Sequence, residues 1–293
     1  MSTTNNFELL SGHHELDTNA DQRVMLRFAV TVGNRQTIRY IEVDDSVYPE
    51  GWHLEQPTQV EFPPFPTGNW NMARLSRDPR SGQPYIWNAT RMNLLGIDRD
   101  QLWHNRAIEY SHLVKHDADL KGDGETTDRL MLVSHPNNNE RKMVLKIMAL
   151  PKAIERDLIT NEIRAYKAVE GLEIAPKFLG FVTEEGRPIG FLTEYIEGAR
   201  HPRRDEEEAC RQALKRFHRK TGLCHPDNNA GNFILKGDRV YIIDFETAGL
   251  PTDEHAFTRD LENFKYSFEV GNFSDEDGDE DEDNYDGYED EEY

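Results

Sequence analysis

The chain has 293 residues, 37% of them hydrophobic, and its 55 Asp and Glu against 34 Lys and Arg give a formal net charge of −21 at pH 7. This length suffices for one large domain or two modest ones. Residues 275–293 hold 13 of the acids and no Lys or Arg, so the rest of the chain carries −8; both parts repel a phosphate backbone, which argues against direct nucleic-acid binding.

No apolar stretch approaches the ~20 residues that a membrane-spanning helix requires, so no membrane partner is expected. The first residues lack the basic start and the apolar core of a secretory signal. Cys210 and Cys224 are too few for a disulfide framework or a zinc site. These features predict a protein of the cytoplasm, with the nucleus as the alternative.

The first third of the chain is predicted to be a flexible lead over residues 1–20 and a β-rich, loop-rich extension over 21–106. Two β-branched runs near its start are separated by Gly33 and Asn34, a pair typical of a hairpin turn. The segments that follow are rich in Pro and Gly and predict surface loops. All four tryptophans fall in this third; they could line a site, but anchoring the loops on a core is the simpler use.

A second β-rich unit is predicted over residues 107–198. Its first strands are expected at 107–114, 129–135 and 141–150. In the third of these, Lys146 shares a strand face with apolar residues two positions away on either side. Lys146 is therefore expected to lie on a covered face, and snorkelling from an edge strand is the alternative.

Two helices are predicted around the end of this unit. Residues 152–170 carry an apolar stripe that ends at Gly171, and Glu162 points along the stripe instead of toward water. Two strands are expected within 176–198. The second helix, over about 204–220, begins with acids that favour the positive end of the helix dipole.

Polar groups then interrupt two apolar segments in which a buried strand would carry none. Asp227 and Asn232 lie in "HPDNNAGNFIL", and Asp244 lies in "YIIDFE". A buried, unpaired carboxylate is too costly to be incidental, so these groups are expected to face a cleft. With Lys146 and Glu162 they follow the order that phosphoryl transfer from ATP needs: a Lys on the phosphates, a Glu holding it, an Asp beside the acceptor hydroxyl, and Asn plus Asp on magnesium.

At these residues the sequence resembles the protein-kinase-like superfamily. The closest branch is that of the aminoglycoside and choline phosphotransferases, in which His-Gly-Asp-x-x-x-Gly-Asn and Asp-Phe/Trp-Glu are usual. A narrower resemblance covers most of residues 60–250 and is to a group of fungal kinase-like proteins. It rests on "GNWNMARLSRDPRSGQPY", "APKFLGFVTEEGRPIGFLTEYIEGARH" and "VYIIDFETA". That group sometimes carries a glycosidase label, which we reject because no paired-carboxylate site is visible.

The resemblance implies an α+β, two-lobed fold with ATP between the lobes. The β-rich N-lobe would span 107–198, and a shortened helical C-lobe would span 199–272. The site residues implied are Lys146 on the phosphates and paired with Glu162, the hinge Thr193, Glu194, Tyr195 and Ile196 against adenine, Asp227 as general base, and Asn232 and Asp244 on Mg²⁺.

Three features depart from that pattern. Before Lys146 the chain offers only Gly122 and Gly124 as a phosphate loop, and the neighbouring Asp123 and Glu125 have the wrong charge for it. Pro226 follows the His, where Gly or Arg is usual. There is no activation segment and little room for the helices that hold a protein substrate, which argues against an ordinary protein kinase.

Three functions therefore stay open. The first is an ATP- and magnesium-dependent phosphotransferase that acts on a small molecule or an atypical substrate, with an unknown phosphate acceptor. The second is a pseudokinase-type binding or scaffold protein. The third is an interaction function for residues 273–293, which would bind a basic protein partner such as a histone. The composition of these residues predicts disorder, and a simple solubilising tail is the alternative.

Overall fold

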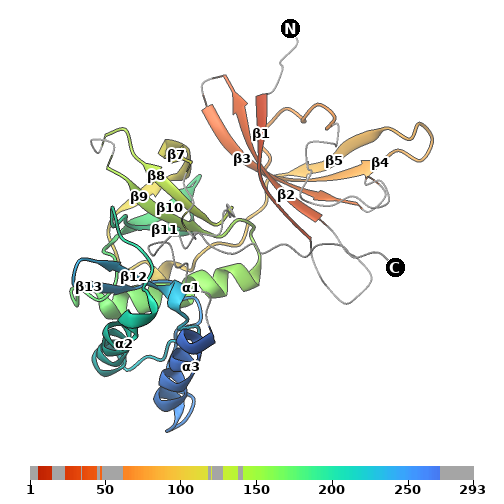
Figure 1. Ribbon diagram of the computed structural model, residues 1–293. Coiled ribbons are helices and arrows are strands. Elements are labelled where there is room, and N and C mark those ends of the chain that lie inside the picture. The colour runs from red at the N-terminus through yellow and green to blue at the C-terminus, as the bar shows by residue number, and fades with distance from the viewer. Residues whose placement is uncertain are drawn as a thin grey trace, which may run out of the picture.

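The structure is a computed structural model that describes residues 6–14, 24–33, 35–44, 47, 62–117, 120, 128–137 and 141–270. Figure 1 shows three parts: the sheet β1–β5, a second sheet β6–β11 with helix α1 beneath it, and the helices α2 and α3 with the small sheet β12–β13.

The first part is a sheet with the strand order β1-β2-β3-β4-β5, which we call the extension sheet. Its strands are β1 (Asn6–His14), β2 (Val24–Val32), β3 (Arg35–Val43), β4 (Met72–Arg77) and β5 (Pro84–Thr90). The hairpin predicted at Gly33 is confirmed, because β2 and β3 pair antiparallel on either side of it. Gly33 has a φ of 61°, a left-handed conformation that glycine adopts at little cost.

The flexible lead predicted for residues 1–20 has to be corrected at residues 6–14. They form β1 and pair antiparallel with β2. The polar composition of this segment suggested a floppy lead, but β2 is an apolar strand whose outer edge offers unpaired N–H and C=O groups. Pairing with that edge satisfies the backbone of both segments and outweighs the weak local preference of the first.

The second part is the N-lobe, a sheet with the order β6-β10-β11-β9-β8-β7 that is packed against α1. Its elements are β6 (Ala107–Glu109), β7 (Val114–His116), β8 (Leu130–Ser134), β9 (Met143–Ile147), α1 (Ala153–Val169), β10 (Phe178–Glu184) and β11 (Arg187–Glu194). The strand predicted over 107–114 is wrong: a 3₁₀ turn, Tyr110–His112, divides it. The reason is topological, because β6 pairs parallel with β10 at one edge of the sheet while β7 pairs with β8 at the other.

Strand β9, which carries Lys146, lies unusually close to β11. Gly190 of β11 is opposite Ile147, and a Cβ at position 190 would lie 2.1 Å from the carbonyl oxygen of Lys146. No side chain fits at that separation. Gly190 therefore sets how closely the two strands pair and, through this, where the backbone of Lys146 lies.

The third part is the C-lobe, which contains fewer elements. These are α2 (Glu207–Thr221), β12 (Phe233–Lys236), β13 (Arg239–Ile242) and α3 (Ala256–Val270). The predicted helix over 204–220 is confirmed, with a 3₁₀ first turn and Gly222 ending it at a φ of 71°. Helix α3 was not predicted. It is fixed by its buried Phe264 and Phe268, and Phe264 meets Phe233 edge to face.

Two shared cores join the three parts. One runs through α1, α2, α3 and the N-lobe sheet. The other joins Ile38 and Tyr40 of the extension sheet to Val133 and Ile189 of the N-lobe. The chain thus has the predicted α+β, kinase-like fold of two lobes with a shortened helical part, preceded by a β extension.

Some predictions lie outside the described residues. They concern most of the flexible lead, the phosphate-loop glycines Gly122 and Gly124, Trp52, and the acidic tail over 273–293. Of the other tryptophans, Trp70 is buried among aromatic rings, and Trp103 packs on Phe178 and donates to the carbonyl of Ile163.

Candidate active site

Lys146 lies at the centre of a cluster of carboxylates where β9, α1 and the segment after β13 meet. Its Nζ is 2.7 Å from Glu162 Oε2, 2.7 Å from Asp244 Oδ1 and 3.2 Å from Glu246 Oε1. Burial alone would lower the pKa of Lys146, but these three carboxylates raise it. Lys146 is therefore a fixed, permanently charged ammonium group, held by residues from three different segments.

Glu162 reaches the cleft because it lies on the buried side of α1. Its neighbours Ile159 and Ile163 are fully buried, and Glu162 itself is only 2% exposed. Burial raises the pKa of Glu162 to about 7, an effect that Lys146 opposes and that Asp244 and Glu246 reinforce. Its Oε2 is buried and, despite the ion pair, makes no hydrogen bond to another described group.

Asp244 follows the end of β13 and has a φ of 59°, a left-handed backbone that is uncommon for residues other than glycine. Such strain persists where the surroundings fix the residue, and it is concentrated at functional sites. Burial works to raise the pKa of Asp244, but Lys146 holds it below its ordinary value. The carboxylate is therefore ionised and points at the lysine.

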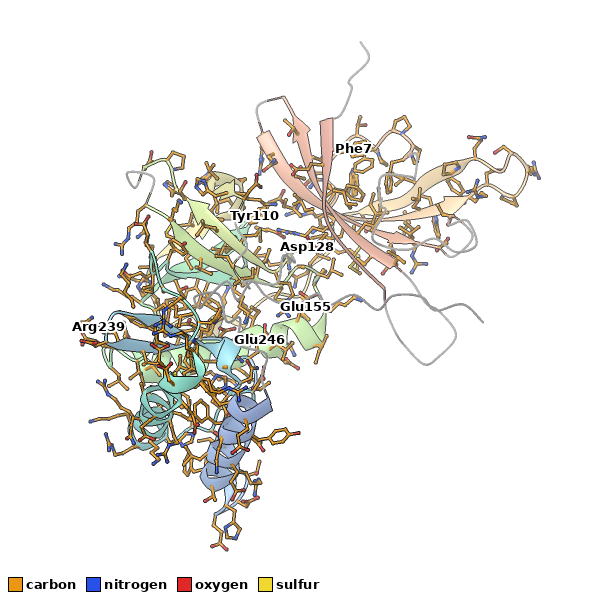
Figure 2. The ribbon with its side chains drawn as sticks, viewed as in Figure 1. Phe7, Tyr110, Asp128, Glu155, Arg239 and Glu246 are labelled. Atoms are coloured by element: carbon orange, nitrogen blue, oxygen red, sulfur yellow. The ribbon has the colours of Figure 1, made fainter. Side chains whose placement is uncertain are left out.

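Glu246 and Arg129 belong to the same cluster, although the sequence analysis did not single them out. Arg129, just before β8, donates from Nη2 to Glu246 Oε1 at 2.6 Å, and its Nε lies 3.9 Å from Glu155 of α1. Figure 2 shows Glu155 and Glu246 beside α1. The signal for Glu246 was present in the Asp-Phe-Glu motif; none pointed to Arg129, because its partner lies 117 positions away.

The carboxylates of this cluster fit a hard divalent cation. Oxygen atoms of Glu162, Asp244 and Glu246 lie within 4.8 Å of one another. Carboxylate oxygens are the ligands that Mg²⁺ takes, usually together with substrate phosphates. Above the pKa of Glu162, the three carboxylates outnumber Lys146 and Arg129 and leave a surplus of negative charge that such a cation would neutralise. The structure thus adds Glu246 to the predicted metal residues.

Asp227 lies in the loop between α2 and β12, as the sequence predicted, with its side chain exposed. Asn229 Nδ2 donates to Asp227 Oδ1 at 2.8 Å, which orients the carboxylate. Asn232, the other predicted metal residue, is buried and donates from Nδ2 to the carbonyl of Asp227 at 2.6 Å. The Asn232 side chain therefore stabilises the backbone of this loop. Its Oδ1 accepts no hydrogen bond from another described side chain.

A buried carboxylate from α3 anchors this loop from behind. Asp260 Oδ2 accepts from the backbone N–H of His225 at 2.6 Å and lies 2.9 Å from His218 Nε2. Asn228 Nδ2 in turn donates to the carbonyl of Asp260 at 2.9 Å. Burial lowers the pKa of His225, which is fully enclosed, so its ring is neutral and structural.

Phe245, between Asp244 and Glu246, connects the lobes. Its ring meets Tyr166 of α1 edge to face at 5.3 Å and stacks on Phe217 of α2 at 5.4 Å. The predicted hinge follows at the end of β11. Thr193 is buried, Glu194 donates its N–H to Lys177 and binds Arg141, and Tyr195 and Ile196 are half-buried.

Replacing Glu162 with Gln should change how stability depends on pH. In the wild type, Glu162 keeps its proton up to a pKa of about 7 in the folded chain but loses it at about 4.5 when unfolded. The bound proton of Glu162 therefore stabilises the folded chain fully below about pH 4.5. This stabilisation falls as the pH rises and is lost once the pH has passed through about 7. In thermal melts in metal-free buffer from pH 5 to 8, the melting temperature of the wild type should fall more steeply with pH than that of Glu162→Gln. Parallel plots of melting temperature against pH would contradict the raised pKa of Glu162.

Comparison with known families gives one match. Residues 192–251 match the family model of the phosphotransferase enzyme family. The matched stretch contains the hinge, Asp227, Asn232 and Asp244, whereas Lys146 and Glu162 precede it. The match supports the relationship to aminoglycoside-type phosphotransferases and indicates a kinase-like phosphotransfer activity; the narrower resemblance to fungal proteins stays a prediction. No curated protein is significantly similar to the chain.

The described part of the chain contains no candidate for a membrane-spanning helix. None of its helices combines the length and the apolar character that crossing a bilayer requires.

Proposed function

We propose that the chain is an ATP- and magnesium-dependent phosphotransferase that acts on a hydroxyl group of a small molecule or an atypical substrate. One observation carries the proposal. Two contacts of 2.7 Å join Lys146 of β9 to Glu162 of α1 and to Asp244 after β13, although the three residues come from separate segments of the chain. The same cluster contains an aspartate with a left-handed backbone and a buried carboxylate with a raised pKa, and such groups are concentrated at functional sites.

The roles follow from charge and position. Lys146 would bind the phosphates of ATP, and Glu162 would hold its ammonium in place. The segment Thr193 to Ile196 would line the adenine site between the lobes. Asp244, Glu246 and Asn232 would hold Mg²⁺, which when bound neutralises charge on the transferring phosphates.

Asp227 would act as the general base. Asn229 binds one oxygen of its carboxylate and so orients the other toward solvent, where an acceptor hydroxyl can approach. The second oxygen would take the proton of that hydroxyl while the oxygen of the acceptor attacks phosphorus. Asp260 and Asn232 would keep the loop rigid, so that the base is held in position before the acceptor binds.

Arg129 would supply a second positive charge to the phosphates. It lies where β8 begins, and Ile147 donates to its carbonyl at 2.9 Å, so its backbone is in register with the end of β9. The loop that precedes it is acidic on balance, with Lys121 as its one basic residue between positions 117 and 128. Arg129→Ala should therefore weaken ATP binding by about tenfold or more, since charged hydrogen bonds are worth about 1.5–3 kcal/mol. AMP, which lacks the β- and γ-phosphates, should bind equally well to both proteins.

Isothermal titration with ATP and with AMP measures this difference. Arg211→Ala is the matched control, because Arg211 forms an exposed ion pair with Glu208 on α2. Equal loss of ATP and AMP affinity in Arg129→Ala would show that Arg129 only supports the fold.

The proposed reaction is tested by transfer of label. The purified full-length chain is incubated with ATP labelled in its γ-phosphate, Mg²⁺, and either the metabolites or the proteins of a cell extract. The proposal predicts a labelled product other than phosphate in one fraction. Labelled product in the protein fraction alone would assign the acceptor to an atypical protein substrate.

A pseudokinase is the second candidate, and one observation favours it. Lys146 is neutralised by three carboxylates, and the loop expected at the phosphates is acidic. Such a protein would keep the fold as a binding module or scaffold. Absence of both transfer and ATP hydrolysis with Mg²⁺ or Mn²⁺, in protein that binds ATP, would favour this candidate.

Residues 273–293 would then add a docking arm for a basic protein, in the cytoplasm or the nucleus. Their charge carries this proposal. Deleting them should abolish capture of a basic partner and leave phosphotransfer unchanged.

A further inference from the structure

A cavity of ≈ 570 Å³ lies between the extension sheet and the N-lobe. Its walls are formed by β3, by the segment 91–99 that leads from the extension to the N-lobe, and by the turn between β10 and β11. None of the residues that surround Lys146 lines it. The cavity is therefore a second, separate concave site, made only where the extension packs on the lobe.

The floor of this cavity is held rigidly by buried ion pairs. Glu184, which is 4% exposed, accepts hydrogen bonds from Arg27, from the hydroxyl of Tyr40 at 2.7 Å and from Arg187. Arg187 also donates to the carbonyl of Leu95 at 2.5 Å. The cavity is thus pre-formed, as ligand sites usually are, because Glu184 and Arg187 bind the hydroxyl of Tyr40 on β3 and the backbone of Leu95 and so link all three walls.

Positive charge is in local surplus around Glu185, one of the residues that line the cavity. Glu185 forms an ion pair with Arg91 and lies 3.7 Å from Arg39, so two guanidinium groups share one carboxylate. Arg35 lies on the same face of β3, four residues before Arg39. Burial lowers the pKa of Arg39, and Arg91 and Arg35 lower it further although Glu185 opposes them. Two guanidinium groups with one carboxylate between them leave a local positive charge, which an oxyanion at Arg91 would neutralise.

The same cavity also offers apolar surface. Leu94 and Met92 of the linking segment and Ile38 of β3 line the cavity. Arg91 has a side chain 40% exposed, so it can turn from Glu185 toward a ligand at the mouth. Its planar guanidinium group suits bidentate contacts with an oxyanion.

We propose that this cavity binds a small anionic molecule, whose phosphate or carboxylate group contacts Arg91 with Arg39 behind it, and whose remaining atoms pack on Leu94. The site joins two parts of the chain, so the ligand stabilises the packing of the extension on the N-lobe. This proposal does not depend on phosphotransfer in the main cleft.

The test is binding of two probes, sodium pyrophosphate and sodium citrate, to the full chain. Isothermal titration and thermal melts are run at constant ionic strength set with chloride. We expect saturable binding of at least one probe and an increase in melting temperature. Arg91→Ala should weaken that binding by about tenfold or more. The matched control Arg80→Ala, which removes an exposed arginine from the β4–β5 turn, should bind like the wild type.

Pyrophosphate could also enter the main cleft, and two variants separate the sites. Lys146→Met should leave the binding unchanged if the cavity holds the probe. Leu94→Trp, which places a larger ring in the cavity, should weaken that binding while the melting temperature without probe is kept. Binding that is lost in Lys146→Met and kept in Arg91→Ala would overturn the proposal, as would the absence of saturable binding by either probe. Preference for pyrophosphate over citrate would identify a phosphate ligand, and the reverse a carboxylate.

Discussion

Asp227→Asn should lower the rate of phosphoryl transfer by about 10²–10⁴-fold, the usual contribution of a general base. The substitution keeps the shape of the side chain and the contact with Asn229, but the amide cannot take the proton of the acceptor hydroxyl. ATP affinity should not change, because the proposed role of Asp227 is to face the acceptor and not the nucleotide. Initial rates with the labelled product, together with ATP titration of the same protein, measure both quantities.

The control for this substitution is Asp238→Asn, an identical change at an exposed position in the turn between β12 and β13. It should transfer phosphate at the wild-type rate. An undiminished rate in Asp227→Asn would remove the residue from the catalytic assignment.

Glu184→Gln should destabilise the chain by about 3–5 kcal/mol, because it leaves buried arginines without their counter-charge. Glu184 holds three partners, Arg27, Tyr40 and Arg187, whereas Arg27 has one carboxylate partner in this network. Arg27→Met should therefore cost less than Glu184→Gln, since Glu184 keeps Arg187 and Tyr40. The free energies of unfolding of the two variants and the wild type, measured in urea, show which substitution costs more.

An exposed pair provides the comparison. Glu208→Gln removes the partner of Arg211 on the surface of α2, where such pairs contribute about 0–1 kcal/mol. A Glu184→Gln variant that is as stable as Glu208→Gln would mean that the extension and the N-lobe do not depend on this network to stay packed.

The parts of the site that sequence could predict are those for which chemistry restricts the residue type. Burial of a charged or polar side chain is costly unless the side chain is paired. This applies to the lysine within an apolar strand, to the glutamate on the apolar stripe of a helix and to the polar residues inside two apolar segments. Their order along the chain then indicated a common cleft. The geometry of Lys146, Glu162 and Asp244 agrees with that expectation, while their roles and that of Asp227 stay proposals.

The parts that sequence could not predict depend on contacts between distant segments. Arg27 and Glu184 are 157 positions apart, and neither carries a local signal of its partner. The parallel pairings of β3 with β4 and of β6 with β10 have no hairpin turn to announce them. Helix α3 was not predicted because its segment is short and leads directly into the acidic tail, although Phe264 and Phe268 have helical spacing.

Titration of the wild type with ATP, once with Mg²⁺ and once with a chelator, tests the central claim most directly. If Lys146, Glu162 and Asp244 form a nucleotide site, ATP binds with Mg²⁺ and binds more weakly without it. Lys146→Met should lose the binding while its far-ultraviolet circular dichroism stays that of the wild type. Equal ATP binding by Lys146→Met and the wild type, or no ATP binding by the wild type with either buffer, would contradict the account.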